Sequence, residues 1–223
     1  MMNRRRAVKD DQKEARRQMI LAVAWQQFQE TAYHAVTMNS VAEQAGLAKG
    51  TVYLYFNTKE ELFLALQEQQ LQAWFDDIDM RLQAAAERTT TIPTIVDLLS
   101  SSLEQRQGLT RLLAILHTIL EHNIERDTAI RFKRMLLTHV ARTGALLEQC
   151  LPFLESGQGA QLLIRIHALV IGLQHLADPA PIVRDVLREH DLQIFNIDFG
   201  NEFARTIRAL LYGLQHESSR SSS

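Results

Sequence analysis

Hydrophobic residues recur at intervals of three and four along most of this chain, and the first such run lies between Asp11 and Glu30. This spacing places apolar side chains on one face of a helix. The run therefore predicts an amphipathic helix over these residues. Its apolar positions are Ala15, Met19, Ile20, Val23, Ala24 and Phe28.

Two short helices are predicted next. Thr37 can accept backbone hydrogen bonds as the N-cap of a helix that stops at Gly46, and a second helix runs from about Ala48 to Tyr55. Gly46 fits a left-handed turn, because glycine has no Cβ to clash there. Two short helices about such a turn are typical of the helix-turn-helix, in which the first helix supports the second in the major groove of DNA.

A long helix is predicted to begin at Thr58, where Thr58 and Glu61 have the spacing of a capping box, and to end before the break at residues 89–93. Beyond it the pattern predicts only helices. Their expected ranges are 94–107, 109–122, 127–150, 158–177, 182–189 and 199–215. The expected fold is all-α, with an N-terminal three-helix helix-turn-helix domain joined to a C-terminal helical domain. The expected divisions are a flexible basic arm (1–10), a DNA-binding domain (11–57), a regulatory and dimerisation domain (58–216) and a disordered tail (217–223).

The composition fits this organisation. The chain has 223 residues, enough for two units, and 46% of them are hydrophobic against 22% charged, as in globular proteins. The lone Cys150 cannot form an intramolecular disulfide, no apolar run approaches the roughly 20 residues of a membrane span, and no signal segment is evident. We expect a cytoplasmic protein that does not interact with membranes.

Charge is distributed unevenly, although the net charge is only -2. Residues 1–60 hold 9 Lys and Arg against 6 Asp and Glu, whereas the remainder holds 15 against 20. Basic residues concentrated at the start could neutralise phosphates. A solvated tail is the alternative. The residues concerned are Arg4, Arg5, Arg6, Lys9, Lys13, Arg16 and Arg17.

The predicted second short helix has an outward face suited to DNA. Apolar residues on the other side can close a small core, namely Val41, Ala45, Leu47, Val52 and Phe56. The residues left facing outward are Lys49, Gly50, Thr51, Tyr53 and Leu54. A cation can pair with phosphate, a glycine permits close approach, a hydroxyl can bond base edges, and apolar groups can contact thymine methyls.

At this point the sequence resembles the N-terminal domain of the TetR family over about residues 14–66. The matching elements are Thr37, Val41-Ala42, Ala45-Gly46-Leu47, Lys49-Gly50-Thr51-Val52-Tyr53, Tyr55-Phe56 and Lys59-Glu60-Glu61-Leu62. The resemblance implies phosphate contacts for Thr37, Tyr55 and Lys59. It implies base or phosphate contacts for Lys49, Thr51 and Tyr53, with Gly50 and Asn39 as further DNA-binding candidates. One departure is Thr31-Ala32, where the family commonly has a glycine that ends the first helix.

The resemblance also implies a homodimer in which the last two long helices pair with their copies. The candidate interface residues are Leu162, Ile166, Leu169, Leu173, Phe203, Ile207, Leu210 and Leu214. Burial of the same stripes inside one chain remains the alternative, because an apolar stripe does not identify its partner.

An effector pocket would lie between the long helix and the helices at 109–122, 127–150 and 158–177. The candidate ligand-binding residues are Trp74, Ile78, Leu113, His117, Leu120, Met135, His139 and Val170. This lining predicts a small, mostly hydrophobic effector with one polar or acidic group. Ordinary core packing is the alternative for each of these residues.

No enzyme signature is found. The histidines lack metal-ligand spacing, and neither a nucleophile elbow nor a glycine-rich phosphate loop is present. We therefore expect no catalytic residue, metal or cofactor. The expected function is a TetR-type repressor that binds a palindromic double-stranded operator as a dimer and is released by the effector. The alternative is a nucleoid or adaptor protein that uses the same DNA-binding domain without an effector.

Overall fold

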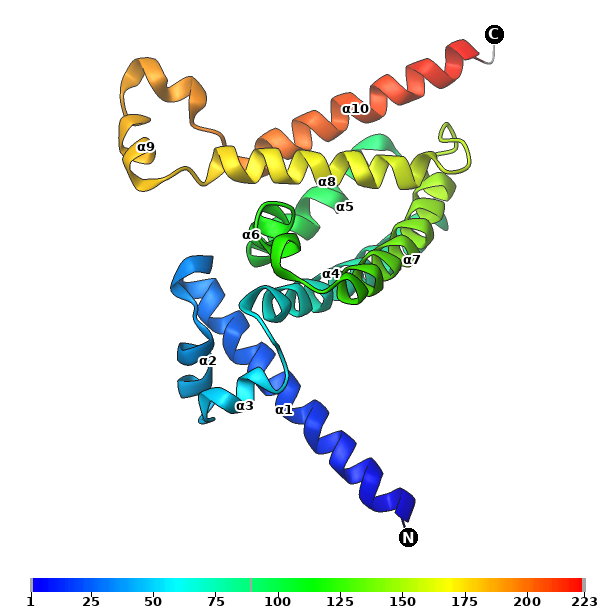
Figure 1. Cartoon of the computed structure of the whole chain (residues 1–223). Helices are drawn as coiled ribbons and strands as arrows, with labels where there is room; N and C mark the ends of the chain where they lie inside the picture. The colour runs from blue at the N-terminus through cyan, green and yellow to red at the C-terminus, as the bar shows by residue number, and fades with distance from the viewer. Residues whose placement is uncertain (1, 89, 222–223) are drawn as a thin grey trace. The chain divides into compact units, whose positions relative to one another are not determined.

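The computed structural model describes residues 2–88 and 90–221, and every regular element in those ranges is helical, which confirms the all-α prediction (Figure 1). The α-helices are α1 (Met2–Glu30), α2 (Met38–Gln44), α3 (Lys49–Tyr53), α4 (Lys59–Ala86), α5 (Ile92–Glu104), α6 (Gln107–Leu116), α7 (Arg126–Cys150), α8 (Gln158–Ala177), α9 (Pro181–Val186) and α10 (Phe199–Ser221). Three short 3-10 helices are η1 (Tyr33–Ala35), η2 (Leu120–Asn123) and η3 (His190–Phe195).

The chain divides into two compact units. The N-terminal unit comprises Met1–Gln69 with Leu116–Arg126, and the C-terminal unit comprises Gln70–Ile115 with Asp127–Ser223. The predicted boundary at residues 57 and 58 was therefore wrong. The first part of α4 belongs to the N-terminal unit because its apolar residues, including Leu62 and Phe63, are fully buried there.

The N-terminal unit has one core formed by α1, α2, α3 and the start of α4. Phe28 of α1 meets Phe63 of α4 edge to face, with ring centroids 5.3 Å apart. The other core residues include Ile20, Leu21, Ala24, Val41, Ala42, Val52, Phe56, Leu62 and Leu66. This core fixes the two short helices against the two long ones.

Two segments expected to lack structure are helical. The first helix begins at Met2, so residues 2–10 continue it instead of forming a flexible arm. The last helix runs to Ser221, so residues 217–221 are helical as well. Neither segment contains glycine or proline, and both join directly onto an amphipathic helix that they can extend. Met1 and residues 222–223 lie outside the described residues, as do the side chains of residues 2–10.

The C-terminal unit is a set of packed helices in which α10 contacts α5 and α8. Between α7 and α8 the backbones themselves touch at Gly144 and Gly159. A Cβ at Gly159 would lie 2.1 Å from the carbonyl oxygen of Gly144, so only glycine fits this crossing.

Buried polar contacts fix α4 within the C-terminal unit. Trp74 Nε1 donates to Ser102 Oγ of α5 at 3.0 Å. On the other side, the Thr143 hydroxyl of α7 donates to Asp79, which also pairs with Arg142. Because an unpaired buried polar group is costly, these contacts determine which face of α4 turns toward each neighbouring helix.

Helix α8 is long and apolar enough to cross a membrane, judged by length and composition alone, a test that helices in protein cores and interfaces also pass. Only 28% of the residues in its most apolar window are buried within the chain. The large apolar side chains of α8 that remain exposed are Ile164 and Leu176.

Candidate nucleic-acid interface

Helix α2 begins at a complete cap. Thr37 Oγ1 accepts from the Ser40 amide at 3.0 Å, and Ser40 Oγ accepts from the Thr37 amide at 3.0 Å. This reciprocal pair confirms Thr37 as the N-cap and satisfies two backbone donors at the helix start. Gln27 of α1 reinforces the position of α2, because its amide donates to the Ser40 carbonyl at 3.0 Å.

The turn between α2 and α3 depends on Gly46, which has a φ of 65° as predicted. The amide of Leu47 reaches back to the Ala42 carbonyl at 2.9 Å, and that of Gly46 to the Glu43 carbonyl at 3.1 Å. These bonds close the end of α2 around a left-handed residue. The chain then enters α3 at Lys49.

Helix α3 buries one face and exposes the other. Val52 is fully buried and Phe56, just beyond the helix, is almost so, whereas Leu54 is 80% exposed and Tyr53 is 40% exposed. On the exposed face, Lys49 Nζ lies 6.0 Å from the centre of the Tyr53 ring, one turn away. A Cβ built at Gly50 would meet nothing within 4 Å, so internal packing does not require a glycine there.

The predicted DNA-binding residues all lie in the N-terminal unit, but their exposure differs. Thr37, Asn39, Lys49, Gly50 and Tyr53 are exposed, whereas Thr51, Tyr55 and Lys59 are half-buried. Two of the exposed residues also have internal partners: Thr37 caps α2, and Asn39 donates to Glu43 at 2.7 Å. The other three exposed residues, Lys49, Gly50 and Tyr53, all lie on α3.

Lys59 has internal partners that the sequence did not reveal. Its ammonium donates to the Tyr33 carbonyl and lies 3.9 Å from the centre of the Tyr33 ring. Burial lowers the pKa of Lys59, although the charge of Glu60 opposes this change. Lys59 thus holds η1 against α4, and its predicted phosphate contact stays a prediction.

Tyr33 completes this cluster. Its hydroxyl donates to Glu60 Oε1 at 3.2 Å, and its ring meets Phe63 edge to face at 4.7 Å. Burial is the largest cause of a raised pKa at Tyr33, and the charge and hydrogen bond of Glu60 raise this pKa further. The preceding turn needs no left-handed residue despite the missing glycine, because Thr31 Oγ1 donates to the Gln27 carbonyl and Ala32 is extended.

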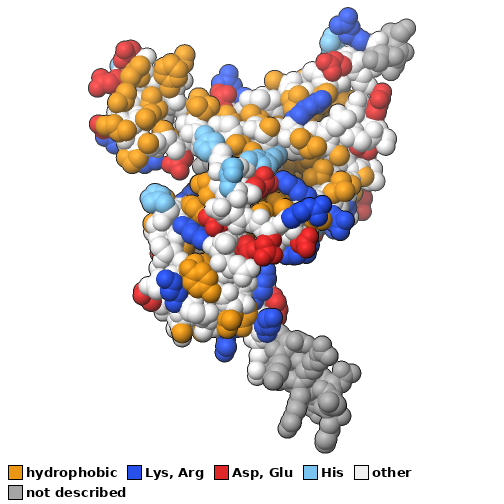
Figure 2. All heavy atoms as spheres, in the orientation of Figure 1, with side chains coloured by type: hydrophobic (Ala, Val, Ile, Leu, Met, Phe, Trp, Pro, Cys, Tyr) orange, Lys and Arg blue, Asp and Glu red, His pale blue; other side chains and the backbone are white. Residues whose placement is uncertain are grey.

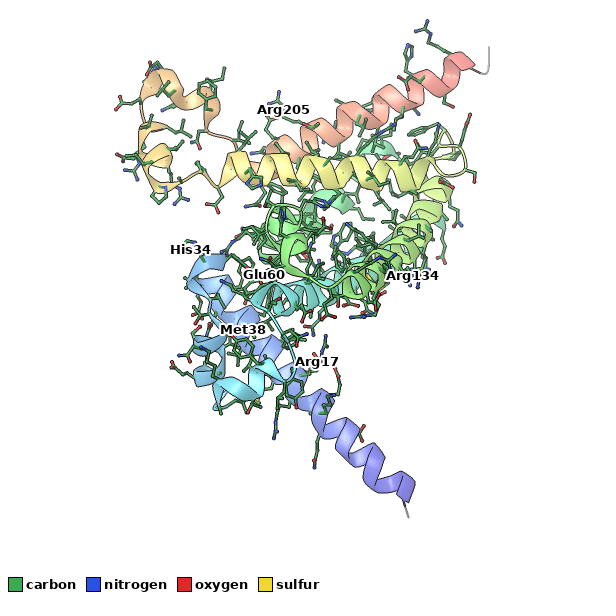
Figure 3. All side chains as sticks on the ribbon, viewed as in Figure 1. Arg17, His34, Met38, Glu60, Arg134 and Arg205 are labelled. Atoms are coloured by element: carbon green, nitrogen blue, oxygen red, sulfur yellow. The ribbon has the colours of Figure 1, made fainter. Side chains whose placement is uncertain are left out.

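Arg17 of α1 is a further residue that sequence reasoning did not assign individually. Its guanidinium lies 5.4 Å from the centre of the Phe56 ring, after the end of α3 (Figure 3). A cation over an aromatic ring contributes about 0.5–1 kcal/mol at exposed sites. Spacing along α1 alone could not identify this contact, because its partner comes from another helix.

The predicted effector-binding residues are divided between the two units. Trp74, Ile78, Leu113, His139 and Val170 are buried in the C-terminal unit and Met135 is half-buried, whereas His117 and Leu120 belong to the N-terminal unit. A groove of about 460 Å³ in the C-terminal unit includes none of them. Its lining residues are Leu103, Glu104, Gln107, Thr110, Arg111, Gln174, Ala177, Asp178, Asp198, Phe199 and Gly200.

The contacts of two predicted pocket residues show why they are in the core. Trp74 is hydrogen-bonded to Ser102, and the His139 ring stacks on Phe75 with centroids 5.0 Å apart. Both side chains therefore have internal partners in the structure. These contacts fit the alternative considered from the sequence, in which Trp74 and His139 are core residues.

Most of the predicted dimer residues are also internal. Leu162, Ile166, Leu173, Phe203 and Ile207 are buried inside the single chain, while Leu169, Leu210 and Leu214 are half-buried. The stripes of α8 and α10 are therefore largely part of the monomer core, and the five buried residues were wrongly assigned to a surface. The exposed apolar side chains on these helices are instead Ile164, Leu176 and Tyr212.

Among the described side chains of residues 11–88 and 90–220, no group of three or more His, Cys, Asp or Glu is arranged to hold a metal ion. Cys150 is buried against the carbonyl of Leu82, with the sulfur 3.4 Å from that oxygen, and burial raises the pKa of its thiol. A thiol kept protonated and buried is a poor nucleophile.

Two family models match the chain. One, described as bacterial regulatory proteins of the tetR family, matches residues 20–66, and the other, described as a tetracyclin repressor-like C-terminal domain, matches residues 68–218. The first match contains the complete helix-turn-helix. The second covers more than half of the chain.

Among known proteins, the chain is 28% identical over 121 residues to the fatty acid metabolism regulator protein of Bacillus subtilis, covering 46% of this chain and 62% of that protein. The chain thus matches less than two thirds of this relative's length. A TetR-family regulator from Mesorhizobium loti has a similar fold, with a TM-score of 0.56, 16% identity, and coverage of 90% and 95%. FadR of Bacillus subtilis in complex with stearoyl-CoA has a TM-score of 0.53, 17% identity, and coverage of 87% and 96%.

Proposed function

Because this chain belongs to the TetR family and is a transcriptional regulator related to regulators of fatty acid metabolism, we propose that it binds duplex DNA through the exposed face of α3. One observation carries the proposal. Val52 and Phe56 anchor α3 in the core, while Lys49, Tyr53 and Leu54 point away from it. An exposed aliphatic side chain such as Leu54 gains nothing from water and suits contact with a groove.

The α3 face offers three kinds of contact. Lys49 supplies a cation for a phosphate, Tyr53 and Leu54 supply apolar surface for base methyl groups, and Thr51 supplies a hydroxyl. Gly50 has open space around its Cα, so DNA can approach the backbone closely. Phosphate contacts position the helix, and contacts to base edges select the sequence.

We propose that the protein binds as a homodimer to two half-sites of a palindromic operator. In such a dimer the recognition helices lie about 34–36 Å apart, in successive major grooves. The exposed apolar side chains of α8 and α10, Ile164 and Tyr212 among them, support a self-complementary interface there. These residues replace the five buried ones as the proposed contact face.

We further propose that a long-chain acyl effector releases the protein from its operator, so that the protein acts as a repressor. The related regulator of fatty acid metabolism and the FadR complex with stearoyl-CoA support this effector class. Release requires the effector to bind more tightly to the arrangement of the dimer that cannot hold DNA. The half-buried Met135 remains a candidate for contact with an acyl chain.

Selection of bound duplexes from random DNA tests the DNA-binding proposal. The selected sequences should share a palindrome, and Tyr53→Ala should lose about tenfold or more in affinity for it. Lys133→Ala removes an exposed cation of α7 and is the matched control for Lys49→Ala. Recovery of unrelated sequences, or equal loss in Lys49→Ala and Lys133→Ala, would refute the assigned face.

The effector proposal has a separate test. Stearoyl-CoA should displace the selected duplex, whereas coenzyme A alone should not, because the acyl chain supplies the buried apolar surface. If stearoyl-CoA neither binds to the protein nor displaces the duplex, the acyl effector is excluded while DNA binding stands. A protein that binds DNA and responds to no effector would match the nucleoid or adaptor alternative.

A further inference from the structure

Gln67 is the one polar side chain that is buried among the described residues of the N-terminal unit. It lies on the third turn of α4 and is fully buried. The other described polar side chains of this unit are at least partly exposed, and Lys, Arg, Asp and Glu side chains are visible on the face that Figure 2 shows. A buried polar residue is informative because burial removes its hydrogen bonds to water.

The Gln67 carboxamide makes no hydrogen bond to any described residue. Both Nε2 and Oε1 are buried, and both are unpaired. Most buried polar groups in folded proteins are paired, because an unpaired group loses its bonds to water without replacement. An apolar side chain of similar size would avoid this loss. The amide therefore lowers the stability of the fold, so packing alone does not explain a glutamine at this position.

The rest of the unit's interior around this part of α4 is apolar. Phe63 and Leu64, one turn before Gln67, are both buried. Residues three or four positions apart share a helix face, so these two side chains lie on the same side of α4 as Gln67. The second segment of the unit adds the buried Leu116 and Leu120. Gln67 is thus suited to a ligand that is mostly hydrophobic and has one hydrogen-bonding group.

The two unpaired atoms of Gln67 specify the chemistry of that group. Nε2 donates and Oε1 accepts, so full pairing requires a ligand group with an acceptor beside a donor. A carboxylate or a thioester carbonyl only accepts, and either would leave Oε1 unpaired. A secondary amide supplies both an acceptor and a donor. The pantetheine arm that joins an acyl chain to coenzyme A contains secondary amides, whereas a free fatty acid has none.

We propose that Gln67 pairs with a secondary amide of an acyl thioester and so distinguishes acyl-pantetheine effectors from free fatty acids. The inference rests on the proposed acyl effector and adds the residue that recognises its polar part. Because Gln67 is fully buried, a ligand reaches it only after neighbouring side chains move. The amide is unpaired in the structure and paired in the bound form, which gives the ligand a higher affinity for the rearranged protein.

The site lies close to the contacts that position α1 and η1 in the N-terminal unit. Phe63 meets Phe28 of α1 at 5.3 Å and Tyr33 of η1 at 4.7 Å, measured between ring centroids. Movement of Phe63 to admit a ligand at Gln67 alters both contacts. Recognition of the amide therefore affects the packing of the unit that contains the proposed DNA-binding helix.

A matched pair of thioesters tests the recognition. Stearoyl-N-acetylcysteamine has an amide near its thioester, whereas S-pentyl thiostearate has a hydrocarbon chain in its place. The wild type should bind the amide ligand about tenfold more tightly, as two ordinary hydrogen bonds allow. Gln67→Met keeps the unbranched shape without the polar atoms and should bind the two ligands equally. Gln72→Met, the same change at an exposed position of α4, is the control and should retain the preference.

Thermal unfolding without ligand provides a second readout. Gln67→Met should unfold about 2–4 °C above the wild type, because the unpaired amide is removed, whereas Gln72→Met should unfold at the wild-type temperature. A lower unfolding temperature in Gln67→Met, or an unchanged preference for the amide ligand in that variant, would overturn the inference. Equal binding of the two thioesters by the wild type would also overturn it and leave the acyl effector intact. If the wild type binds neither thioester nor stearoyl-CoA, the proposed acyl effector itself is wrong.

Discussion

In the N-terminal unit, the residues that form the core differ from those expected to bind DNA. In the C-terminal unit, by contrast, most of the residues expected to bind an effector or a second copy are core residues. Val52 is buried and its neighbour Tyr53 is exposed on the same short helix. In α8, by contrast, Ile166 and Leu162 were expected at an interface and are buried. A motif with defined spacing identifies a function, but an apolar stripe identifies only burial.

The largest expected effect concerns the core of the N-terminal unit. Phe28→Ala should lower the free energy of unfolding by about 3–5 kcal/mol, because it leaves a cavity beside Phe63. Denaturant titration followed by circular dichroism measures this loss. Leu54→Ala, at an exposed apolar position, is the control and should change stability by less than about 0.5 kcal/mol. Equal losses in the two variants would contradict the division between core and DNA-binding residues.

A pair of isoleucines separates core from interface in the C-terminal unit. Ile166→Ala should cost about 2–5 kcal/mol in unfolding free energy, since the side chain is buried within one chain. Ile164→Ala, 62% exposed, should instead weaken the dimer and leave the stability of the monomer nearly unchanged. Unfolding and sedimentation at two protein concentrations distinguish these outcomes. If Ile166→Ala dissociated a fully stable protein, the original interface assignment would be right.

Two glycines, Gly46 in the α2–α3 turn and Gly50 in α3, should behave in opposite ways. Gly46→Ala should destabilise the protein by about 1–2 kcal/mol, because its φ of 65° is unfavourable for alanine. Gly50→Ala should preserve stability and weaken DNA binding, because the new methyl group has no internal neighbour but would lie between α3 and the groove. Thermal unfolding and duplex titration are measured on both variants. Intact DNA affinity in Gly50→Ala would argue against close approach of the backbone.

The cap of α2 gives a smaller effect. Thr37→Ala should lower the free energy of unfolding by about 1 kcal/mol, since the Ser40 amide loses its acceptor. Thr37→Ser keeps that acceptor and should restore most of the loss. Chemical denaturation of the two variants is the measurement. A Thr37→Ser variant as unstable as Thr37→Ala would show that the capping oxygen is not what matters.

The smallest effect is expected at alkaline pH. The pKa of Tyr33 in the folded protein lies above its ordinary value of 10.0, so the folded state favours the protonated phenol. The resulting stabilisation is complete below pH 10 and is lost as the pH rises above that value. Tyr33→Phe cannot ionise and should show a flatter decline in stability above pH 10. The pKa of Lys59 is lowered in the folded protein, so its contribution to stability changes with pH in the opposite direction. A steeper decline in Tyr33→Phe than in the wild type would contradict the role assigned to the Tyr33 hydroxyl.

The sequence predicted the helix-turn-helix well because local rules determine it. Thr37 as a cap and Gly46 as a left-handed turn residue follow from hydrogen bonding and steric freedom within a few residues. The partners of Lys59 and Arg17 could not be predicted in the same way. Their contacts join residues 26 and 39 positions apart, Tyr33 and Phe56, and depend on how the helices pack.

The ends of the chain and the effector pocket were predicted least well. A polar run such as residues 2–10 has no hydrophobic period, yet it continues as a helix because nothing in it interrupts α1. For the pocket, Trp74 and His139 have the right composition for ligand contact, but the same apolar and aromatic groups fill cores. Only the packed arrangement shows which of the two applies.

The salt dependence of DNA binding tests the role of the exposed α3 face most directly. The affinity for the selected duplex is measured against salt concentration for the wild type, Lys49→Ala and the control Lys133→Ala. Because each lost phosphate contact lowers the slope of log affinity against log salt by about 0.9, Lys49→Ala should lower it by about 1.8 in a dimer, and Lys133→Ala should not change it. An identical slope and affinity in all three proteins would contradict the assignment of α3 as the DNA-binding element.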